Sequence, residues 1–189
     1  HEGLVLFVGA SGTGKSTTMA ALVDRINTRR RGHVITIEDP IEFVHEPRLC
    51  MISQRSVGLH TRSFAGALKS ALRENPDVIL VGEMRDLETI ALAIKAAETG
   101  HLVLATLHTP SAAKTVERII NVFPPAEQSQ VRILLADTLR AVVAQMLLPR
   151  GDGHGRVAAH EVLLATSGVR AMIRDGKTHE LASAIQMGA

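Results

Sequence analysis

The chain of 189 residues has a composition that is ordinary for one folded domain, with 46% apolar and 21% charged residues. No apolar run approaches the ~18 residues that a membrane-spanning helix requires. The formal net charge is only +2, and the chain has no Trp or Tyr to stack on bases, so we expect no nucleic-acid partner. A single cysteine, Cys50, excludes an internal disulfide and a four-cysteine zinc site, and it suits a cytoplasmic protein.

Short apolar runs alternate with helical periodicity along the chain, a pattern that predicts an α/β fold with a mainly parallel central sheet flanked by helices. We expect strands, in chain order, at Leu4–Val8, Val34–Ile37, Val78–Val81, Leu102–Thr106 and Val157–Leu163. We expect helices at Lys15–Thr28, Ser63–Arg73, Leu87–Glu98, Ala112–Asn121, Ala126–Leu147, Ser167–Asp175 and Thr178–Gln186. The segment from Gly151 to Gly155 is expected to be a loop.

Residues 9–16 form a complete G-x-x-x-x-G-K-S phosphate loop between the first expected strand and the first expected helix. A buried strand ends there, glycines let the backbone wrap an anion, and a helix begins with its free N–H groups aimed at the same point. Lys15 is expected to reach the β- and γ-phosphates of a nucleoside triphosphate, and the Ser16 hydroxyl to bind Mg²⁺. The expected nucleotide-binding residues are Gly9, Ala10, Ser11, Gly12, Thr13, Gly14, Lys15, Ser16 and Thr17.

Acidic residues follow the second expected strand. Glu38, Asp39 and Glu42 lie within five residues and would repel one another unless a cation or hydrogen-bond donors compensate. Pro40 ends the strand there. Because open α/β sheets bind their ligands beyond the carboxyl ends of the strands, we expect these acids beside the phosphate loop.

Two further segments place polar residues at the ends of expected strands. Val78–Val81 is followed by Gly82 and Glu83, and four apolar residues before an acid resemble the strand that presents a metal-directed carboxylate in phosphate-loop enzymes. Gly82 occupies the usual Asp position, so it stays open whether Glu83 meets Mg²⁺ directly, through water, or acts as a base. His108 follows the strand ending at Thr106. An isolated His in such a place is more often a structural hydrogen-bond donor; the alternative, beside Thr106 and Thr109, is a sensor of the γ-phosphate.

These four segments, in this order and at about this spacing, resemble the secretion-type hexameric ATPases of type II secretion and type IV pili. Within that group the resemblance is greatest to the motors of pilus retraction. It is carried by TIEDPIEFVHE at 36–46, VGEMRDLET at 81–89, AETGHL at 97–102 and RVAAHE at 156–161, and it covers almost the whole chain.

The resemblance implies a RecA-like ATPase domain over residues 1–189. Family members carry a PAS-like domain before it, and because the chain starts at His1 without a Met we expect a piece of a longer polypeptide that lacks this domain and the C-terminal tail. The family also implies a ring-shaped homo-hexamer, peripheral at the inner membrane. Such rings use ATP and Mg²⁺ to generate motion against an inner-membrane platform protein.

The resemblance also assigns roles to residues. Glu42 would polarise the attacking water, Glu83 would orient the Mg²⁺ shell, and His108 would report the γ-phosphate. Arg73 and Arg118 are candidates for neutralising charge in the transition state, in the same subunit or a neighbouring one.

Pilus-extension motors of the family usually carry four zinc-binding cysteines, whereas this chain has only Cys50. The resemblance therefore favours a retraction motor over an extension motor. Arg170 and Arg174 match two arginines of a C-terminal motif of retraction motors at the same i,i+4 spacing, although several neighbouring positions differ. The alternatives are a motor for pilus extension or type II secretion, a RecA-type DNA translocase, and a catalytically silent nucleotide-binding scaffold. A translocase would need basic DNA-binding loops, and a silent scaffold would be expected to lack Lys15, Glu42 or Glu83.

Overall fold

The computed structural model describes residues 2–188, which divide into two compact units. Unit 1 comprises the residues up to Val5 and Ser16–Thr106, and unit 2 comprises Leu6–Lys15 and the residues from Leu107 onward. Strand β1 (Gly3–Val8) contributes residues to both units. The seven strands follow the hydrogen-bonded order β3-β2-β4-β5-β1-β6-β7. The expected α/β class with a mainly parallel sheet is confirmed.

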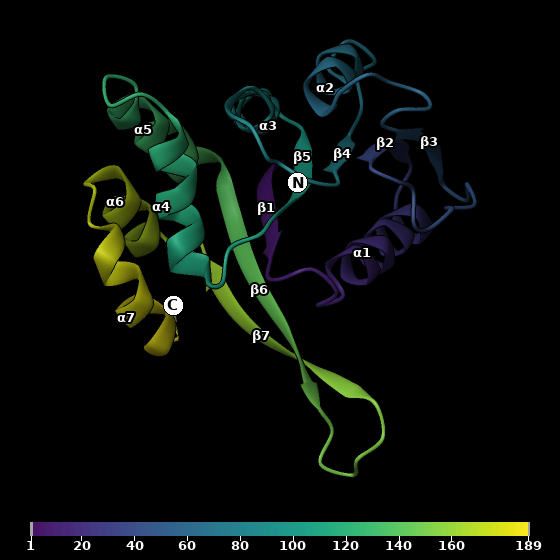
Figure 1. Cartoon of the computed structure of the whole chain (residues 1–189). Helices are drawn as coiled ribbons and strands as arrows, with labels where there is room; N and C mark the ends of the chain where they lie inside the picture. Colours follow the sequence, from purple (N-terminus) through teal and green to yellow (C-terminus); the bar gives the residue numbers. More distant parts are fainter. Residues whose placement is uncertain (1, 189) are drawn as a thin grey trace. The chain divides into compact units, whose positions relative to one another are not determined.

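Unit 1 is built on a parallel arrangement of β3, β2, β4 and β5, because each neighbouring pair runs in the same direction. Figure 1 shows α1 on one face of these strands and α2 with α3 on the other. Fully buried Ile35, Ile79 and Leu104 form the core between the layers. The elements are α1 (Lys15–Arg29), β2 (Gly32–Glu38), β3 (Cys50–Ser56), α2 (Phe64–Ala71), β4 (Val78–Val81), α3 (Leu87–Glu98) and β5 (Leu102–Leu107).

Two helices of unit 1 begin at a side-chain cap. The Ser63 hydroxyl accepts from the Gly66 N–H at the start of α2, and the Asp86 carboxylate accepts from the Thr89 N–H at the start of α3. Each cap satisfies a backbone donor that has no partner within its helix and is worth about 1 kcal/mol. The Asp86 cap thereby fixes the residue at which the loop that carries Glu83 ends and α3 begins.

Unit 2 is a long β-hairpin with helices packed along it (Figure 1). Strands β6 (Leu139–Pro149) and β7 (Arg156–Leu164) pair antiparallel from Ala141 opposite Leu164 to Pro149 opposite Arg156. The helices are α4 (Ala112–Val122), α5 (Gln128–Thr138), α6 (Ser167–Arg174) and α7 (Leu181–Gln186), with the short 3₁₀ helix η1 (Thr178–Glu180) before the last. No helix among residues 2–188 is long and apolar enough to cross a membrane.

The helix expected over Ala126–Leu147 is wrong in its second half. Helix α5 ends at Thr138, and the following residues form β6. Leu, Ala, Met and Gln favour a helix in this stretch, but pairing with β7 decides the outcome, since strand formation depends on neighbours more than on propensity. The edge strand β3 was not predicted either, because its sequence CMISQRS shows no clear alternation. The helix expected over Thr178–Gln186 is divided into the 3₁₀ helix η1 and α7, and the other expected elements are present with boundaries shifted by at most a few residues.

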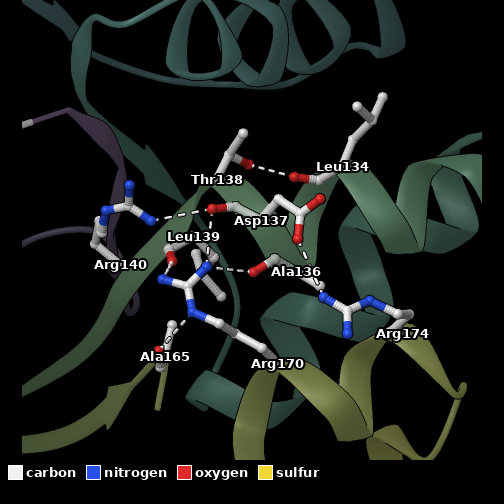
Figure 2. Close-up of polar contacts among 9 residues, drawn as sticks. All are labelled: Leu134, Ala136, Asp137, Thr138, Leu139, Arg140, Ala165, Arg170 and Arg174. Atoms are coloured by element: carbon white, nitrogen blue, oxygen red, sulfur yellow. Dashed lines mark hydrogen bonds and ion pairs between the residues drawn. The ribbon is translucent and has the colours of Figure 1, made fainter. Parts of the chain in front are cut away.

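Arg170 on α6 joins three segments of unit 2. Its guanidinium donates to the carbonyls of Ala136 at 2.5 Å, Asp137 at 2.8 Å, Leu139 at 2.9 Å and Ala165 at 2.8 Å, as Figure 2 shows. The first two carbonyls belong to the last turn of α5, where helix carbonyls lack intrahelical partners. Burial, as the largest cause, lowers the pKa of Arg170. One cation thus closes α5 and fixes the start of β6 and the end of β7.

Arg174, one turn further along α6, makes a different kind of contact. Its guanidinium pairs with the Asp137 carboxylate at 3.1 Å, and both side chains are about half exposed. Exposed pairs of this kind contribute little to stability because water screens them. The two arginines of the C-terminal motif therefore differ in what they do for the fold.

We expect Arg170→Ala to lower the free energy of unfolding by about 2–4 kcal/mol, because it leaves several carbonyls of α5 and β6 without a donor. Arg174→Ala is the matched control and should cost less than about 1 kcal/mol. Urea titrations of both variants measure the difference. Equal losses in the two variants would contradict a joining role for Arg170.

Candidate functional site

The phosphate loop follows β1 without a break. Gly9 and Gly14 have φ angles of +139° and +86°, which side chains other than glycine rarely adopt. The Lys15 side chain folds back over the loop, and its ammonium donates to the carbonyls of Gly9 and Ala10, both at 2.8 Å. Lys15 is only 8% exposed, so these bonds offset the cost of burying its charge. The loop thus holds a buried cation against its own backbone, and the role of Lys15 toward phosphate stays a prediction.

Ser16 and Glu42 lie together in unit 1. The Ser16 hydroxyl donates to Glu42 Oε1 at 3.0 Å, although 26 positions separate them in the chain. Helix α1 positions the serine in its first turn, and the segment after β2 brings the carboxylate to it. The sequence predicted that the acidic residues between Glu38 and Glu42 would lie beside the phosphate loop, and this contact agrees with that prediction for Glu42.

Glu38, at the end of β2, is held differently. Its Oε1 accepts from the Thr36 hydroxyl at 2.6 Å and from the Gln54 amide at 3.3 Å. Gln54 also donates to the Phe43 carbonyl at 2.9 Å and accepts from the His45 N–H at 2.8 Å. Gln54 thus shapes the segment that carries Glu42. Sequence reasoning missed this residue because it lies on β3, the strand that was not expected.

Gly82, in the usual Asp position of the strand motif, lies in a crowded place. A Cβ at this position would lie 3.1 Å from the Ile37 carbonyl oxygen and 3.2 Å from Glu38 Cα. The Gly82 N–H donates to the same Ile37 carbonyl at 2.7 Å. The ends of β2 and β4 therefore approach so closely that a Cβ at position 82 would force backbone atoms apart by a few tenths of an ångström. The acid of the motif lies one position along the chain, at Glu83.

Glu83 forms an ion pair with Arg85, in which the two charged groups are 2.6 Å apart and the Glu83 side chain is 18% exposed. The hydrogen bond that Arg85 donates to this carboxylate, followed by the charge of the carboxylate, raises the pKa of Arg85. Arg85 lies within the motif VGEMRDLET but was not assigned a role from the sequence. The negative charge of Glu83 is partly neutralised by this neighbour.

The segment Thr106–Thr109, which contains His108 and is called here the histidine box, begins in unit 1 and continues in unit 2. Thr106 is buried at the end of β5, and its hydroxyl donates to the Gly82 carbonyl at 2.5 Å, while the Met84 N–H donates to the Thr106 carbonyl at 3.0 Å. These two bonds tie the loop of Glu83 to β5. His108 lies exposed just after β5. Its role toward a γ-phosphate stays a prediction.

The two arginines proposed for transition-state charge are both exposed. Arg73 follows the end of α2 in unit 1, and Arg118 lies on α4 in unit 2. Exposure is what contact with a neighbouring subunit would require. Whether either arginine takes part in hydrolysis stays a prediction.

The oxygen donors around Ser16 fit Mg²⁺. This ion prefers octahedral oxygen coordination and is usually bound by one or two protein oxygens together with phosphates and water. Ser16 Oγ is such a donor, and the Glu42 carboxylate lies 3.0 Å from it, close enough to contact a water molecule bound to the same ion. Among residues 2–188, no three His, Cys, Asp or Glu side chains gather as a metal cluster would require.

The buried Cys50 thiol donates to the Arg30 carbonyl at 3.2 Å, and burial, the largest cause, raises the pKa of this thiol.

The chain belongs to the family of Type II/IV secretion system proteins, and residues 1–184 match the model of this family. The "Twitching motility protein" of Neisseria gonorrhoeae is 57% identical over 187 residues, covering 99% of this chain and 50% of that protein. The type IV pilus retraction ATPase PilT of Pseudomonas aeruginosa is 55% identical over 187 residues, covering 99% of this chain and 54% of that protein. The chain thus spans about half the length of these relatives.

Among solved structures, the chain is similar to the pilus retraction motor PilT with bound ADP. The TM-score is 0.95 at 51% sequence identity, over 98% of this chain and 54% of that one. The resemblance to this group that the motifs indicated is confirmed.

We expect Gly82→Ala to lower the free energy of unfolding by about 1–3 kcal/mol, because the added Cβ meets backbone atoms that cannot rotate away. Gly168→Ala on α6 is the control, since a Cβ there meets nothing within 4 Å and helix propensity favours Ala by up to ~1 kcal/mol. Chemical denaturation compares the two. A Gly82→Ala variant as stable as the parent would show that β2 and β4 can move apart.

Proposed function

We propose that the chain is an ATP-hydrolysing motor domain that drives retraction of type IV pili. The observation that carries the proposal is the contact of Ser16 with Glu42 at 3.0 Å, which brings a metal-binding hydroxyl and a carboxylate to one point. A phosphate loop alone indicates nucleotide binding; a carboxylate beside its serine adds a group that acts on water. The names of the similar proteins, a twitching motility protein and a pilus retraction ATPase, favour retraction.

In the proposed reaction, water attacks the γ-phosphorus and ADP leaves with the bridging oxygen. Glu42 accepts the proton of the attacking water. Ser16 would hold Mg²⁺, which would supply neutralisation of charge on the phosphates. Lys15 is the cation for the β- and γ-phosphates, and its ammonium exchanges the carbonyls of its own loop for phosphate oxygens.

Glu83 serves in a second role. Because Arg85 neutralises part of its charge, it is the weaker candidate for accepting a proton. We assign it to orienting the Mg²⁺ shell through water, with His108 reporting the γ-phosphate. Arg73 and Arg118 neutralise transition-state charge from neighbouring subunits, which would make a single subunit slow.

The proposed assembly is a homo-hexamer, cytoplasmic and peripheral at the inner membrane, acting on a pilus platform protein. The RecA-like domain of residues 1–189 would work together with a PAS-like domain and a C-terminal tail of a longer polypeptide. A motor for pilus extension or type II secretion is the second candidate from the same family. It is less favoured because the two relatives compared belong to twitching motility and retraction.

We expect Lys15→Ala to weaken ATP binding by about 10²-fold, because two charge-assisted hydrogen bonds to phosphate are lost. Isothermal titration of the purified protein measures the affinity. Lys69→Ala is the control, since Lys69 forms an exposed ion pair with Glu88 on the surface of unit 1. Unchanged ATP affinity in Lys15→Ala would place the triphosphate elsewhere.

We expect Glu42→Gln to leave ATP affinity within about threefold while hydrolysis falls by ~10²–10⁴, because the amide accepts no proton. Glu83→Gln should keep more activity, since its charge is already shared with Arg85. Steady-state phosphate release with parallel ATP titrations separates the two effects. If hydrolysis survives in Glu42→Gln but is abolished in Glu83→Gln, the two roles must be exchanged.

A further inference from the structure

Gln145, on β6, is a polar residue that the proposed reaction does not use. It is only 6% exposed, although it lies on the strand that pairs with β7. Buried amides are retained where their hydrogen bonds are satisfied, since an unsatisfied group costs more than an apolar side chain would. The partners of Gln145 therefore indicate what the side chain is for.

The phosphate loop lies directly against Gln145. The side-chain Nε2 donates to the Thr13 carbonyl at 2.6 Å. A Cβ on Gly14 would lie 2.9 Å from the same Nε2, and a Cβ on Gly9 would lie 2.3 Å from the main-chain oxygen of Gln145. Close approach to the main chain of Gln145 thus requires glycine at position 9, and the amide of the same residue packs directly against Gly14.

The bond to Thr13 has a consequence for the next peptide group. The Thr13–Gly14 peptide is trans, because the single cis bond among residues 2–188 joins Asp39 to Pro40. In a trans peptide the C=O and the following N–H point in opposite directions. With the Thr13 carbonyl held on Gln145, the Gly14 N–H is directed away from β6. Backbone N–H groups of such loops bind the phosphate anion.

His160 lies at the other end of the Gln145 amide. It lies directly opposite Gln145 in the register of β6 and β7, and its Nε2 is 3.3 Å from Gln145 Oε1. With Nε2 protonated, the histidine donates to this oxygen. The reverse amide orientation would place Oε1 against the Thr13 carbonyl, where two acceptors repel. The strand β7 thereby reaches the phosphate loop through one side-chain amide.

We propose that Gln145 is a positioning residue for nucleotide binding: its amide holds the Thr13–Gly14 peptide so that the Gly14 N–H faces the phosphates. The proposal rests on the proposed function, in which this loop binds ATP. The proposal gives β6 a part in nucleotide binding, although Gln145 lies outside the phosphate-loop motif and outside the segments that carry Glu42 and Glu83.

The test is Gln145→Glu, which keeps the shape but puts an acceptor in place of the donor. Gln145→Met is the second variant; it has similar size and no charge, and it keeps the experiment informative if the glutamate does not fold. Isothermal titration with ATP and with ADP should show both nucleotides bound about tenfold more weakly by either variant, since both carry the β-phosphate. Thermal unfolding without nucleotide is measured in parallel.

Gln128→Glu is the matched control. Its Nε2 donates to the Phe123 carbonyl at 3.1 Å near the start of α5, so the same kind of bond is lost without touching the phosphate loop. It should lower the unfolding temperature and leave ATP affinity within about twofold. An equal loss of affinity in Gln128→Glu would overturn the proposal, because it would show a general effect of stability.

The outcomes separate the inference from the proposed function. If the unchanged protein does not bind ATP, the proposed function fails and the inference with it. If the unchanged protein binds ATP and the folded Gln145 variants bind it within about twofold of the same affinity, the inference alone is overturned. Weakened binding in the Gln145 variants with normal binding in Gln128→Glu supports it.

Discussion

The conformation of residues 9–15 depends on the groups that hold the carbonyls of this loop. The carbonyls of Gly9 and Ala10 accept from the Lys15 ammonium, and the Thr13 carbonyl accepts from Gln145. Each bound carbonyl turns its peptide N–H the other way. The glycines allow the necessary backbone angles, but the orientation is set by the groups that hold the carbonyls.

The carboxylates of unit 1 are distinguished by their partners. Glu38 accepts from Thr36 and Gln54, Glu42 from the neutral hydroxyl of Ser16, and Glu83 pairs with a cation. The Glu83 carboxylate is engaged by a cation that competes with water for it, whereas the Glu42 carboxylate contacts a neutral hydroxyl. The assignment of proton transfer to Glu42 therefore rests on electrostatic environment as well as on the position of this residue in its motif.

The phosphate loop, the strand at 78–81 and the acid-rich segment could be predicted from the sequence because their patterns are local. A glycine-lysine-serine loop and a run of four β-branched or leucine residues specify their structure within a few positions. Other features depend on neighbours distant in the chain. The crowding at position 82 comes from the approach of Ile37 and Glu38, and the ion pair of Glu83 with Arg85 follows from a loop conformation that tertiary bonds to Thr106 fix.

The incorrect helix over 139–147 shows how one such error hides a site. On a helix, Gln145 would be one polar side chain among apolar neighbours, with no relation to the phosphate loop. On β6, paired with β7, the same residue faces His160 and reaches Thr13. The next residue of β7, Glu161, accepts from the Ala112 N–H at the start of α4, at 2.7 Å. Adjacent side chains of a strand point to opposite faces, so β7 holds the phosphate loop through one face and the helix after the histidine box through the other. The glycine-rich segment at 151–155, flanked by apolar runs of similar length, was the signal for this hairpin.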